Sequence, residues 1–521
     1  MSETLRQKLQ LISTDSLLPE LTRINRGIEK EGLRTTPGGE LSQTGHPAAL
    51  GSALTHPHIT TDYSEALLEF ITPVFQTPAG VIDFLDQVHR FCHSKLDNEF
   101  VWAASMPCFL GGEPSIPIAR YGSSNTGQLK HIYRVGLAWR YGKMMQTIAG
   151  IHYNFSLPES FWGKYQAVLA DTSSIADFQT QAYFSLIRNF RRYSWLILYL
   201  FGASPALCPS FLQGRAHQLE KLHDSLHLPF ATSLRMGDLG YHNSAQQNLG
   251  ICYNSLDRYV TTLGRAINTN YAPYEEIGVF RENEYRQLNS NILQIENEYY
   301  SDIRPKRVAS SSQKPLQVLA KKGVEYIEVR NLDIDPYVPL GISEQQIHFL
   351  DCFLLYCLLK DSPVTSNHES KIQEANKQRV VNRGREPGLK LSRNPTQEIP
   401  LSEWGEEIFD DLLLVAQTMD RANHTQSFTQ AIKQERSKLH DASLTPSARV
   451  INDLSAGATS FFRFSRRQSM AHRDYFISHS LSDEQLDYFN RLTRQSLEEQ
   501  ADLEAQDRLE FADYLRRYLE Q

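Results

Sequence analysis

The sequence predicts an α+β fold, in which helices and strands come from interspersed parts of the chain. Residues 183–197 space their apolar side chains as a helix does, whereas five polar or acidic segments alternate with the period of two that a strand requires. No internal repeat or heptad pattern is present. Of the 521 residues 41% are hydrophobic and 22% are charged, which is typical of a globular protein with a large core.

Charge and hydropathy argue against two classes of partner. The net charge of −7 leaves no strongly positive field for nucleic acid or for anionic membranes. The longest apolar runs, residues 195–201 and 352–359, are far shorter than the roughly 20 residues that span a bilayer. Residues 1–12 have helical spacing and no apolar signal region, so we expect a cytoplasmic protein. Its six cysteines are scattered without a CxxC pair, which predicts reduced thiols.

The first acid-rich strand is predicted over residues 26–33. Glu29 and Glu31 lie two positions apart in it, and therefore their side chains point to the same face of the strand. Two like charges that lie so close together favour a cation between them. This spacing predicts one wall of a metal site.

A second strand is predicted over residues 61–70, with its apolar side chains packed on one face. Glu65 and Glu69 lie on the opposite face, and Asp62 stands at the mouth of the segment. The segment therefore offers further carboxylates to the same kind of site.

Three further segments, residues 152–157, 293–300 and 323–330, alternate in the same way. The polar residues that share a face are His152, Asn154 and Ser156 in the first, Gln294, Glu296 and Glu298 in the second, and Tyr326, Glu328 and Arg330 in the third. For any single strand, a solvated sheet face explains this pattern better than a site does. Five such strands together favour a site, and hard oxygen ligands of this kind suit Mg²⁺ or Mn²⁺.

The common nucleotide-binding motifs are absent from the sequence. Residues 122–129 read GSSNTGQL, which imitates the glycines of a phosphate-binding loop but has Gln128 and Leu129 where Lys and Ser or Thr are required. No GxGxxG follows a strand, and no GxSxG nucleophile motif occurs. If the protein uses ATP, it binds the nucleotide in another way.

Several longer strings resemble the proteobacterial glutamate–cysteine ligase family. The strings include RGIEKEGLR, THPHITTDYSEALLEFITPV, MMQTIAGIHYNFSLP, ATSLRMGDLGY, LQIENEYYSDIRPKR and GVEYIEVRNLDIDP. The resemblance is dense over residues 24–336 and looser to about residue 424. It implies a fold similar to the catalytic domain of glutamine synthetase, with a curved antiparallel sheet that forms a funnel-shaped active site surrounded by helices.

The resemblance also implies an activity and its small-molecule partners. The family joins the γ-carboxyl group of L-glutamate to the amine of L-cysteine through γ-glutamyl phosphate, with ATP as co-substrate and Mg²⁺, or alternatively Mn²⁺, as the metal. This reaction is the first step of glutathione biosynthesis. We expect a monomer with L-glutamate, L-cysteine and ATP as partners, and with neither nucleic acid nor membrane.

Individual residues acquire roles from the resemblance where this sequence matches the family's motifs. The implied metal-binding residues are Glu29, Glu31, Asp62, Glu69, His152 and Glu328. Glu328 and Arg330 are the implied catalytic residues, and Arg330 would contact the transferring phosphoryl group. The implied cysteine pocket consists of Tyr63, Tyr133, Leu137, Gln146, Arg235, Tyr241 and Tyr300. Arg134 is expected to bind the α-carboxylate of glutamate, and Tyr63 departs from the Phe that the family leads us to expect.

The domain organisation is predicted as a catalytic part, residues 1–385, followed by a mainly helical segment, residues 386–521, that packs on it or is appended to it. The basic, Gly- and Pro-containing stretch 377–400 is the candidate boundary. Two other functions remain compatible with the residue patterns. A metal-dependent hydrolase could use the same acids without ATP, and a catalytically silent protein could bind a nucleotide without turnover.

Overall fold

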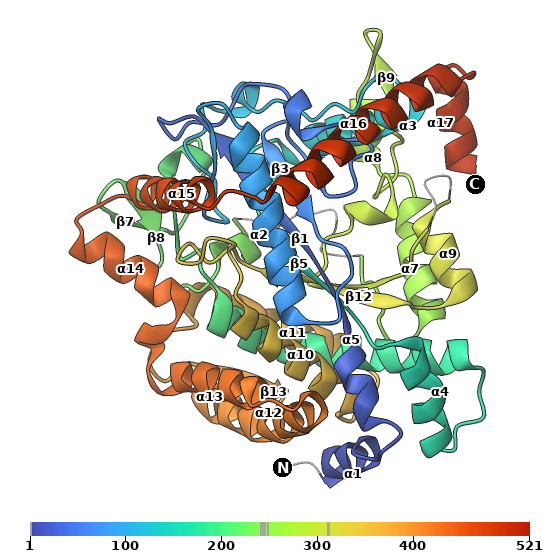
Figure 1. Cartoon of the computed structure of the whole chain (residues 1–521), viewed down its shortest axis with the longest axis vertical. Helices are drawn as coiled ribbons and strands as arrows, with labels where there is room; N and C mark the ends of the chain where they lie inside the picture. Colours follow the sequence, from blue (N-terminus) through green and yellow to red (C-terminus); the bar gives the residue numbers. More distant parts are fainter. Residues whose placement is uncertain (1–2, 240–245, 247–248, 310–312, 521) are drawn as a thin grey trace.

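A seven-stranded antiparallel sheet runs through the computed structural model, which describes all residues except 1–2, 240–245, 247–248, 310–312 and 521 (Figure 1). The strand order is β11, β12, β5, β1, β3 and β2, and β4 pairs with one end of β1. The bounds of the strands are β1 (Asn25–Thr35), β2 (Ile59–Thr61), β3 (Leu67–Ile71), β4 (Phe100–Val101), β5 (Ile151–Ser156), β11 (Ile303–Lys306) and β12 (Tyr326–Leu332). The predicted α+β class is confirmed.

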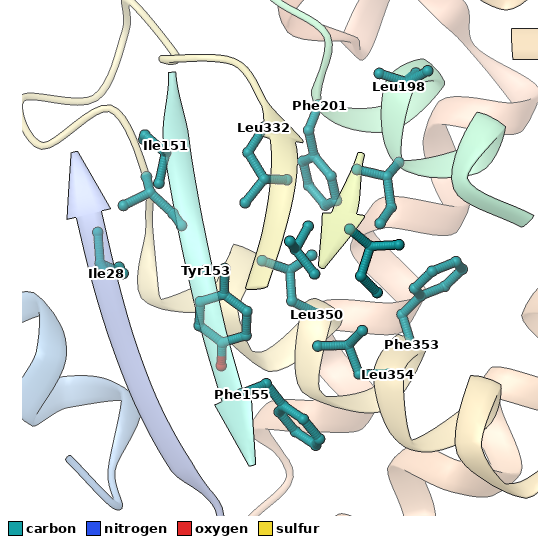
Figure 2. Packing of buried hydrophobic residues seen from close by; sticks show 14 of the residues in the cluster. Ile28, Ile151, Tyr153, Phe155, Leu198, Phe201, Leu332, Leu350, Phe353 and Leu354 are labelled. Carbon is teal, nitrogen blue, oxygen red and sulfur yellow. The ribbon is translucent and has the colours of Figure 1, made fainter. Parts of the chain in front are cut away.

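One face of this sheet is apolar and buried by helices. Ile28 on β1 lies opposite Tyr153 on β5, and both side chains are fully buried. They pack in one hydrophobic cluster with residues of α5 (Ile175–Phe201) and α10 (Glu344–Leu359), as Figure 2 shows. Because strand residues alternate between faces, the side chains next to these in sequence point to the other face. Packing of the apolar face therefore fixes the position of the strands, and the acids lie on their opposite face.

The pairing of the strands brings the acids of different segments together. Glu29 lies opposite His152 across the β1–β5 pair, and Glu31 lies opposite Glu69 across the β1–β3 pair. Glu328 lies on β12, the next strand beyond β5. The predicted strands at residues 26–33, 152–157 and 323–330 are therefore confirmed, and they are neighbours in one sheet.

The predicted strand at residues 293–300 is wrong, because the described chain forms a short 3-10 helix there, Glu296–Glu298. The carboxylate of Glu298 accepts a hydrogen bond from the backbone N–H of Gln294 at 2.7 Å, and it pairs with Arg140 at 2.9 Å. These interactions hold the segment in a turn, and the alternation of polar residues did not indicate them.

The second predicted strand is divided in two by a turn between β2 and β3. Glu65 lies in this turn, and its carboxylate accepts hydrogen bonds from the backbone N–H groups of His46 at 2.7 Å and Arg120 at 2.6 Å. Glu65 therefore braces loops, whereas Glu69 on β3 belongs to the polar face of the sheet. Asp62 begins the turn directly after β2.

The remaining described elements lie around the sheet. The helices up to residue 383 are α1 (Glu3–Ile12), α2 (Pro78–Lys95), α3 (Asn125–Tyr141), α4 (Glu159–Val168), α7 (Leu256–Ile267), α8 (Ala272–Ile277), α9 (Pro315–Lys322) and α11 (Asn367–Arg383). The small strands are β6 (Ala206–Leu207), β7 (Glu220–Leu222), β8 (Ser225–His227), β9 (Phe280–Arg281) and β10 (Glu284–Tyr285). No helix in the described part of the chain is long and apolar enough to cross a membrane.

The C-terminal part packs on the rest of the molecule. Its elements are β13 (Lys390–Asn394), β14 (Gln397–Pro400), α12 (Leu401–Asn423), α13 (Ser427–His440), α14 (Pro446–Ala456), α15 (Phe461–Ser478), α16 (Asp483–Gln506) and α17 (Phe511–Glu520). Figure 1 shows α15 and α16, in red, crossing α2. Phe489 of α16 is fully buried, with its ring 5.0 Å from that of Phe91 on α2. The predicted boundary stretch 377–400 contains the end of α11 and a β-hairpin.

Candidate active site

Three neighbouring strands direct a carboxylate, an imidazole and a second carboxylate to one point. Glu29 Oε2 lies 3.1 Å from His152 Nδ1, and Glu328 Oε1 lies 3.7 Å from the same nitrogen. One potential ligand atom from each of these three residues lies within 4.8 Å of the others. Glu31 Oε1 approaches the other ring nitrogen of His152 at 3.6 Å. The structure thus brings four of the six predicted metal-binding residues into direct contact.

The other two predicted metal-binding residues complete the acidic cluster. Burial and the charges of Glu29, Asp62 and Glu31 raise the pKa of Glu69 well above its ordinary value. Burial, together with Asp62, also raises the pKa of Glu31, although His152 opposes this effect. These carboxylates are therefore close enough to repel one another. A shared cation relieves such repulsion.

Arg330 stands at the edge of this cluster. Its Nη1 lies 2.9 Å from Glu328 Oε1 and 3.3 Å from His152 Nδ1. Burial alone would raise the pKa of Glu328, but the charges of Arg330 and Lys306 outweigh burial and hold that pKa well below its ordinary value. Glu328 is therefore ionised at neutral pH.

The acidic cluster has the donor atoms that a divalent cation requires. Glu29, His152 and Glu328 converge, and the buried Oε2 of Glu328 has no hydrogen-bond partner in the part of the chain that the structure describes. Carboxylate oxygens with one imidazole nitrogen suit Mg²⁺ or Mn²⁺. The residues present therefore fit a hard divalent ion.

A small cavity of about 80 Å³ opens beside the acids. It is lined by Glu31, Asp62, Tyr63, Tyr133, Arg134, Leu137, Gln146, Ile148, Asn297, Glu298, Tyr300, Arg304 and Arg330. Five residues of the predicted cysteine pocket therefore line this cavity together with Arg134. Sequence reasoning missed Ile148 and Asn297, for which the alternation patterns contain no signal. Glu298 lines the cavity although it is not on a strand.

One other residue of the predicted cysteine pocket, Arg235, does not line this cavity. Arg235 lies in a neighbouring cavity of about 100 Å³, which shares Tyr300 and Arg330 with the first one. Its guanidinium donates to the backbone oxygen of Arg330 at 2.9 Å and lies 3.6 Å from Asp333. Tyr241 lies outside the described residues.

A larger cavity of about 300 Å³ is lined in part by β11 and β12, and it shares Asn297 and Arg304 with the small one. Apolar and aromatic walls come from Tyr259, Leu316, Leu319 and Tyr326, and Lys306 adds a cation. The Nζ of Lys306 lies 3.8 Å from Glu328. This larger cavity is therefore next to the acidic cluster and has room for a ring system.

Comparison with known proteins identifies the family. A model of the glutamate–cysteine ligase family matches residues 9–380. The chain belongs to the glutamate–cysteine ligase family. It is 51% identical to the glutamate–cysteine ligase of Azotobacter vinelandii over 522 aligned positions, which cover 99% of this chain and 98% of that protein. It is 50% identical to the glutamate–cysteine ligase of Pseudomonas aeruginosa over 519 positions, with the same coverage of both proteins.

Solved structures share the fold. The crystal structure of a glutamate–cysteine ligase from Francisella tularensis in complex with AMP matches with a TM-score of 0.90 at 36% identity, covering 96% of this chain and 98% of that one. A bifunctional glutathione synthetase from Pasteurella multocida matches with a TM-score of 0.75 at 24% identity, covering 93% of this chain and 58% of that one. At 24% identity the second match shows the fold alone. Together these findings confirm the fold that the resemblance implied.

Proposed function

We propose that the protein joins the γ-carboxyl group of L-glutamate to the amine of L-cysteine and converts ATP to ADP and phosphate. The observation that carries this proposal is an acidic cluster that adjoins two cavities, in a chain of the glutamate–cysteine ligase family. The small cavity has the size for amino-acid side chains, and the larger one has the size for a nucleotide base. The AMP bound to the Francisella tularensis relative supports a nucleotide site.

The acidic cluster is the proposed metal site. Glu29, Glu31, Asp62, Glu69, His152 and Glu328 would hold Mg²⁺, with Mn²⁺ as the alternative. When bound, the metal supplies positive charge that lets the γ-carboxylate of glutamate approach the phosphate oxygens of ATP. His152, placed between Glu29 and Glu328, orients both carboxylates.

The proposed reaction has two steps. A γ-carboxylate oxygen of glutamate attacks the γ-phosphorus of ATP, the bond from that phosphorus to the bridging oxygen breaks, and ADP leaves. The amine of cysteine, after losing a proton to solvent, then attacks the carbon of the acyl phosphate; phosphate leaves, and the nitrogen releases its second proton to solvent as the amide forms. Arg330 donates hydrogen bonds to the phosphoryl oxygens, and Arg134 pairs with the α-carboxylate of glutamate.

The acceptor cysteine would lie against the tyrosine-rich wall of the small cavity. Tyr63, Tyr133, Leu137, Gln146 and Tyr300 provide this wall, and Gln146 Nε2 donates to the hydroxyl of Tyr300 at 3.3 Å. Apolar ring surfaces suit a small thiol side chain. Arg235 would reach the carboxylate of cysteine from the neighbouring cavity, and Tyr241 is proposed for the same pocket on the resemblance alone.

An assay of ADP release tests the proposal. The enzyme is incubated with ATP and Mg²⁺ alone, then with glutamate, and then with glutamate and cysteine, and γ-glutamylcysteine is measured by mass spectrometry. We expect ADP and dipeptide in equal amounts only when both amino acids are present. Turnover without ATP would indicate a hydrolase, and nucleotide binding without ADP release would indicate a silent binding protein.

Three further proposals concern the setting of this activity. The protein is a monomer, which light scattering after size-exclusion chromatography tests. It acts in the cytoplasm, which fractionation of cells tests. Residues 386–521 form a segment packed on a catalytic part of residues 1–385, and expression of residues 1–385 alone would show whether that part folds by itself.

A further inference from the structure

Arg304 lies where the small cavity and the large cavity meet. It lines both of them, and its strand β11 places it directly opposite Glu328 of β12. Asn297 also lines both cavities, but it carries no charge. Arg304 is therefore the charged residue that adjoins both cavities in the described structure.

Arg304 is buried without a carboxylate partner. Its residue is 8% exposed, and Nη2 donates to the backbone oxygens of Asn297, at 3.0 Å, and Tyr299. Within the described residues, no carboxylate lies within ion-pair distance of Arg304, and no acceptor binds its Nε or Nη1. The hydrogen bonds that this guanidinium can still donate are therefore available to a ligand. Burying a charge without a counter-charge raises the free energy of the folded protein, and a bound anion lowers it again.

The charged residues nearest to Arg304 do not neutralise its guanidinium. Glu328, the nearest acid across the strand pair, already accepts from Arg330 at 2.9 Å. Burial and the charge of Arg330 lower the pKa of Arg304, and Glu328 opposes them only in part. Arg304 and Arg330 thus both line the small cavity, but of these two arginines only Arg330 forms an ion pair with Glu328.

Three other buried arginines in the described chain bind protein acceptors with several of their donors. Arg26 pairs with Asp351 at 2.8 Å, and Arg140 pairs with Glu298 at 2.9 Å. Arg188, which is also 8% exposed and has no carboxylate partner in the described structure, donates to protein oxygens, including that of Ser362 at 3.0 Å, and lines neither of the two cavities. Arg304 differs from them because its unpaired donors adjoin empty space.

We propose that Arg304 is a second catalytic arginine, which binds the phosphoryl group while it passes from the nucleotide cavity to glutamate. This inference rests on the proposed function. The bond between the γ-phosphorus and the bridging oxygen of ADP breaks, the bond to the γ-carboxylate oxygen of glutamate forms, and Arg304 stays protonated and donates to the equatorial oxygens throughout. It shares this work with Arg330, which approaches from β12.

The first test compares Arg304→Met and Arg304→Lys with the wild type in ADP release at saturating glutamate, cysteine and Mg²⁺. We expect Arg304→Met to lower kcat by about 100-fold or more, because a donor aimed at developing charge is lost. Arg304→Lys should recover only a part of kcat, since a point charge does not replace a planar fork. The KM for ATP should change much less than kcat.

Arg188→Lys is the matched control, because this arginine has the same exposure and lies outside the proposed site. We expect it to lower the melting temperature and to leave kcat unchanged. Thermal unfolding of every variant separates lost chemistry from lost structure. A normal kcat in Arg304→Met would overturn the inference, as would a loss confined to the KM for ATP or a loss equal to the unfolded fraction.

A second test asks whether Arg304 acts by direct contact. Arg304→Ala leaves space for a small guanidinium, so added ethylguanidinium should restore ADP release, whereas ethylammonium should restore less. Failure of ethylguanidinium to restore activity in a folded variant would overturn direct contact. If the wild type itself releases no ADP that depends on glutamate, the proposed function fails, whereas an active wild type with an equally active Arg304→Met defeats only the role of Arg304.

Discussion

Glu31 on β1 and Glu69 on β3 stand directly opposite each other across one antiparallel strand pair. Like charges in that position normally destabilise a sheet. Here Asp62 and Glu29 add further negative charge, and the pKa of Glu69 is raised by burial and by these neighbours. The sheet therefore has a strained arrangement of charge that a cation would relieve.

Glu69→Gln should stabilise the protein when no divalent metal is present. Because the folded-state pKa of Glu69 is raised above 4.5, wild-type stability should fall as the pH rises through that folded-state value, and the variant should lack this loss. We expect a gain of about 0.5–1 kcal/mol near neutral pH in EDTA. Adding Mg²⁺ should raise the melting temperature of the wild type more than that of the variant. Equal responses to Mg²⁺ would argue against Glu69 as a metal-binding residue.

Arg330→Lys should lose most activity while the fold is retained. Arg330 contacts both Glu328 and His152, and a lysine cannot make both contacts and donate in bidentate fashion to a phosphoryl group. We expect kcat to fall by about 100-fold or more, with a smaller change in the KM for ATP. Arg281→Lys, at an exposed position on β9, serves as the control. Near-normal kcat with weak ATP binding would show that Arg330 contributes to the binding of ATP and not to the stabilisation of the transition state.

Tyr63→Phe should change selectivity for the acceptor. Tyr63 is 1% exposed, and none of the described residues supplies a hydrogen-bond partner for its hydroxyl. If the thiol of bound cysteine is the partner of this hydroxyl, the variant should lose several-fold in kcat/KM for cysteine. It should lose little for α-aminobutyrate, which has a methyl group in place of the thiol. The wild type should accept α-aminobutyrate with a loss of about 1–3 kcal/mol. An equal effect on both amines would mean that the hydroxyl does not contact the thiol.

Asp351→Asn should destabilise the protein without changing the site directly. Asp351 is fully buried, pairs with Arg26 at 2.8 Å and accepts from the hydroxyl of Tyr153 at 2.7 Å. Breaking a buried ion pair leaves a guanidinium uncompensated, which costs about 3–5 kcal/mol. Urea unfolding measures the loss, with the exposed Asp361→Asn as control. A loss below about 1 kcal/mol would show that the pair contributes little.

Lys30→Met should alter how stability depends on pH. Lys30 points away from Glu29 and Glu31, lies 2.9 Å from the Nε2 of His89, and has its pKa lowered by burial to about 7. Between pH 7 and its ordinary value of 10.5 the unfolded chain binds more protons at this lysine, so wild-type stability should rise with pH across that range. The variant should show a flatter profile. Parallel melting curves for the wild type and the variant over this range would contradict the burial of an uncharged Lys30.

The sequence predicted correctly how Glu29 and Glu31 lie on their strand, but it predicted the wrong local structure around Glu298. The spacing of Glu29 and Glu31 indicates a shared strand face, and the structure has it. The same reasoning placed Glu298 on a strand, which is wrong because Arg140 and the backbone of Gln294 bind its carboxylate in a turn. Alternation reports which face a residue would take if the segment were a strand, but it does not report a local hydrogen bond that prevents the strand.

The position of Arg304 could not be predicted from the sequence, because an arginine there is equally compatible with a surface ion pair. By itself the sequence determined the α+β class, the family and the short-range geometry of each acid-bearing strand, because these depend on the two-residue period of a strand and on contiguous motifs. Only the tertiary structure decided that β1, β5 and β12 are neighbours, which brings Glu29, His152 and Glu328 within reach of one ion. Only it decided that Arg304 is buried where two cavities meet, with no carboxylate of the described residues within ion-pair distance. Strand order and burial arise from packing between residues far apart in the chain, and no local pattern records such contacts.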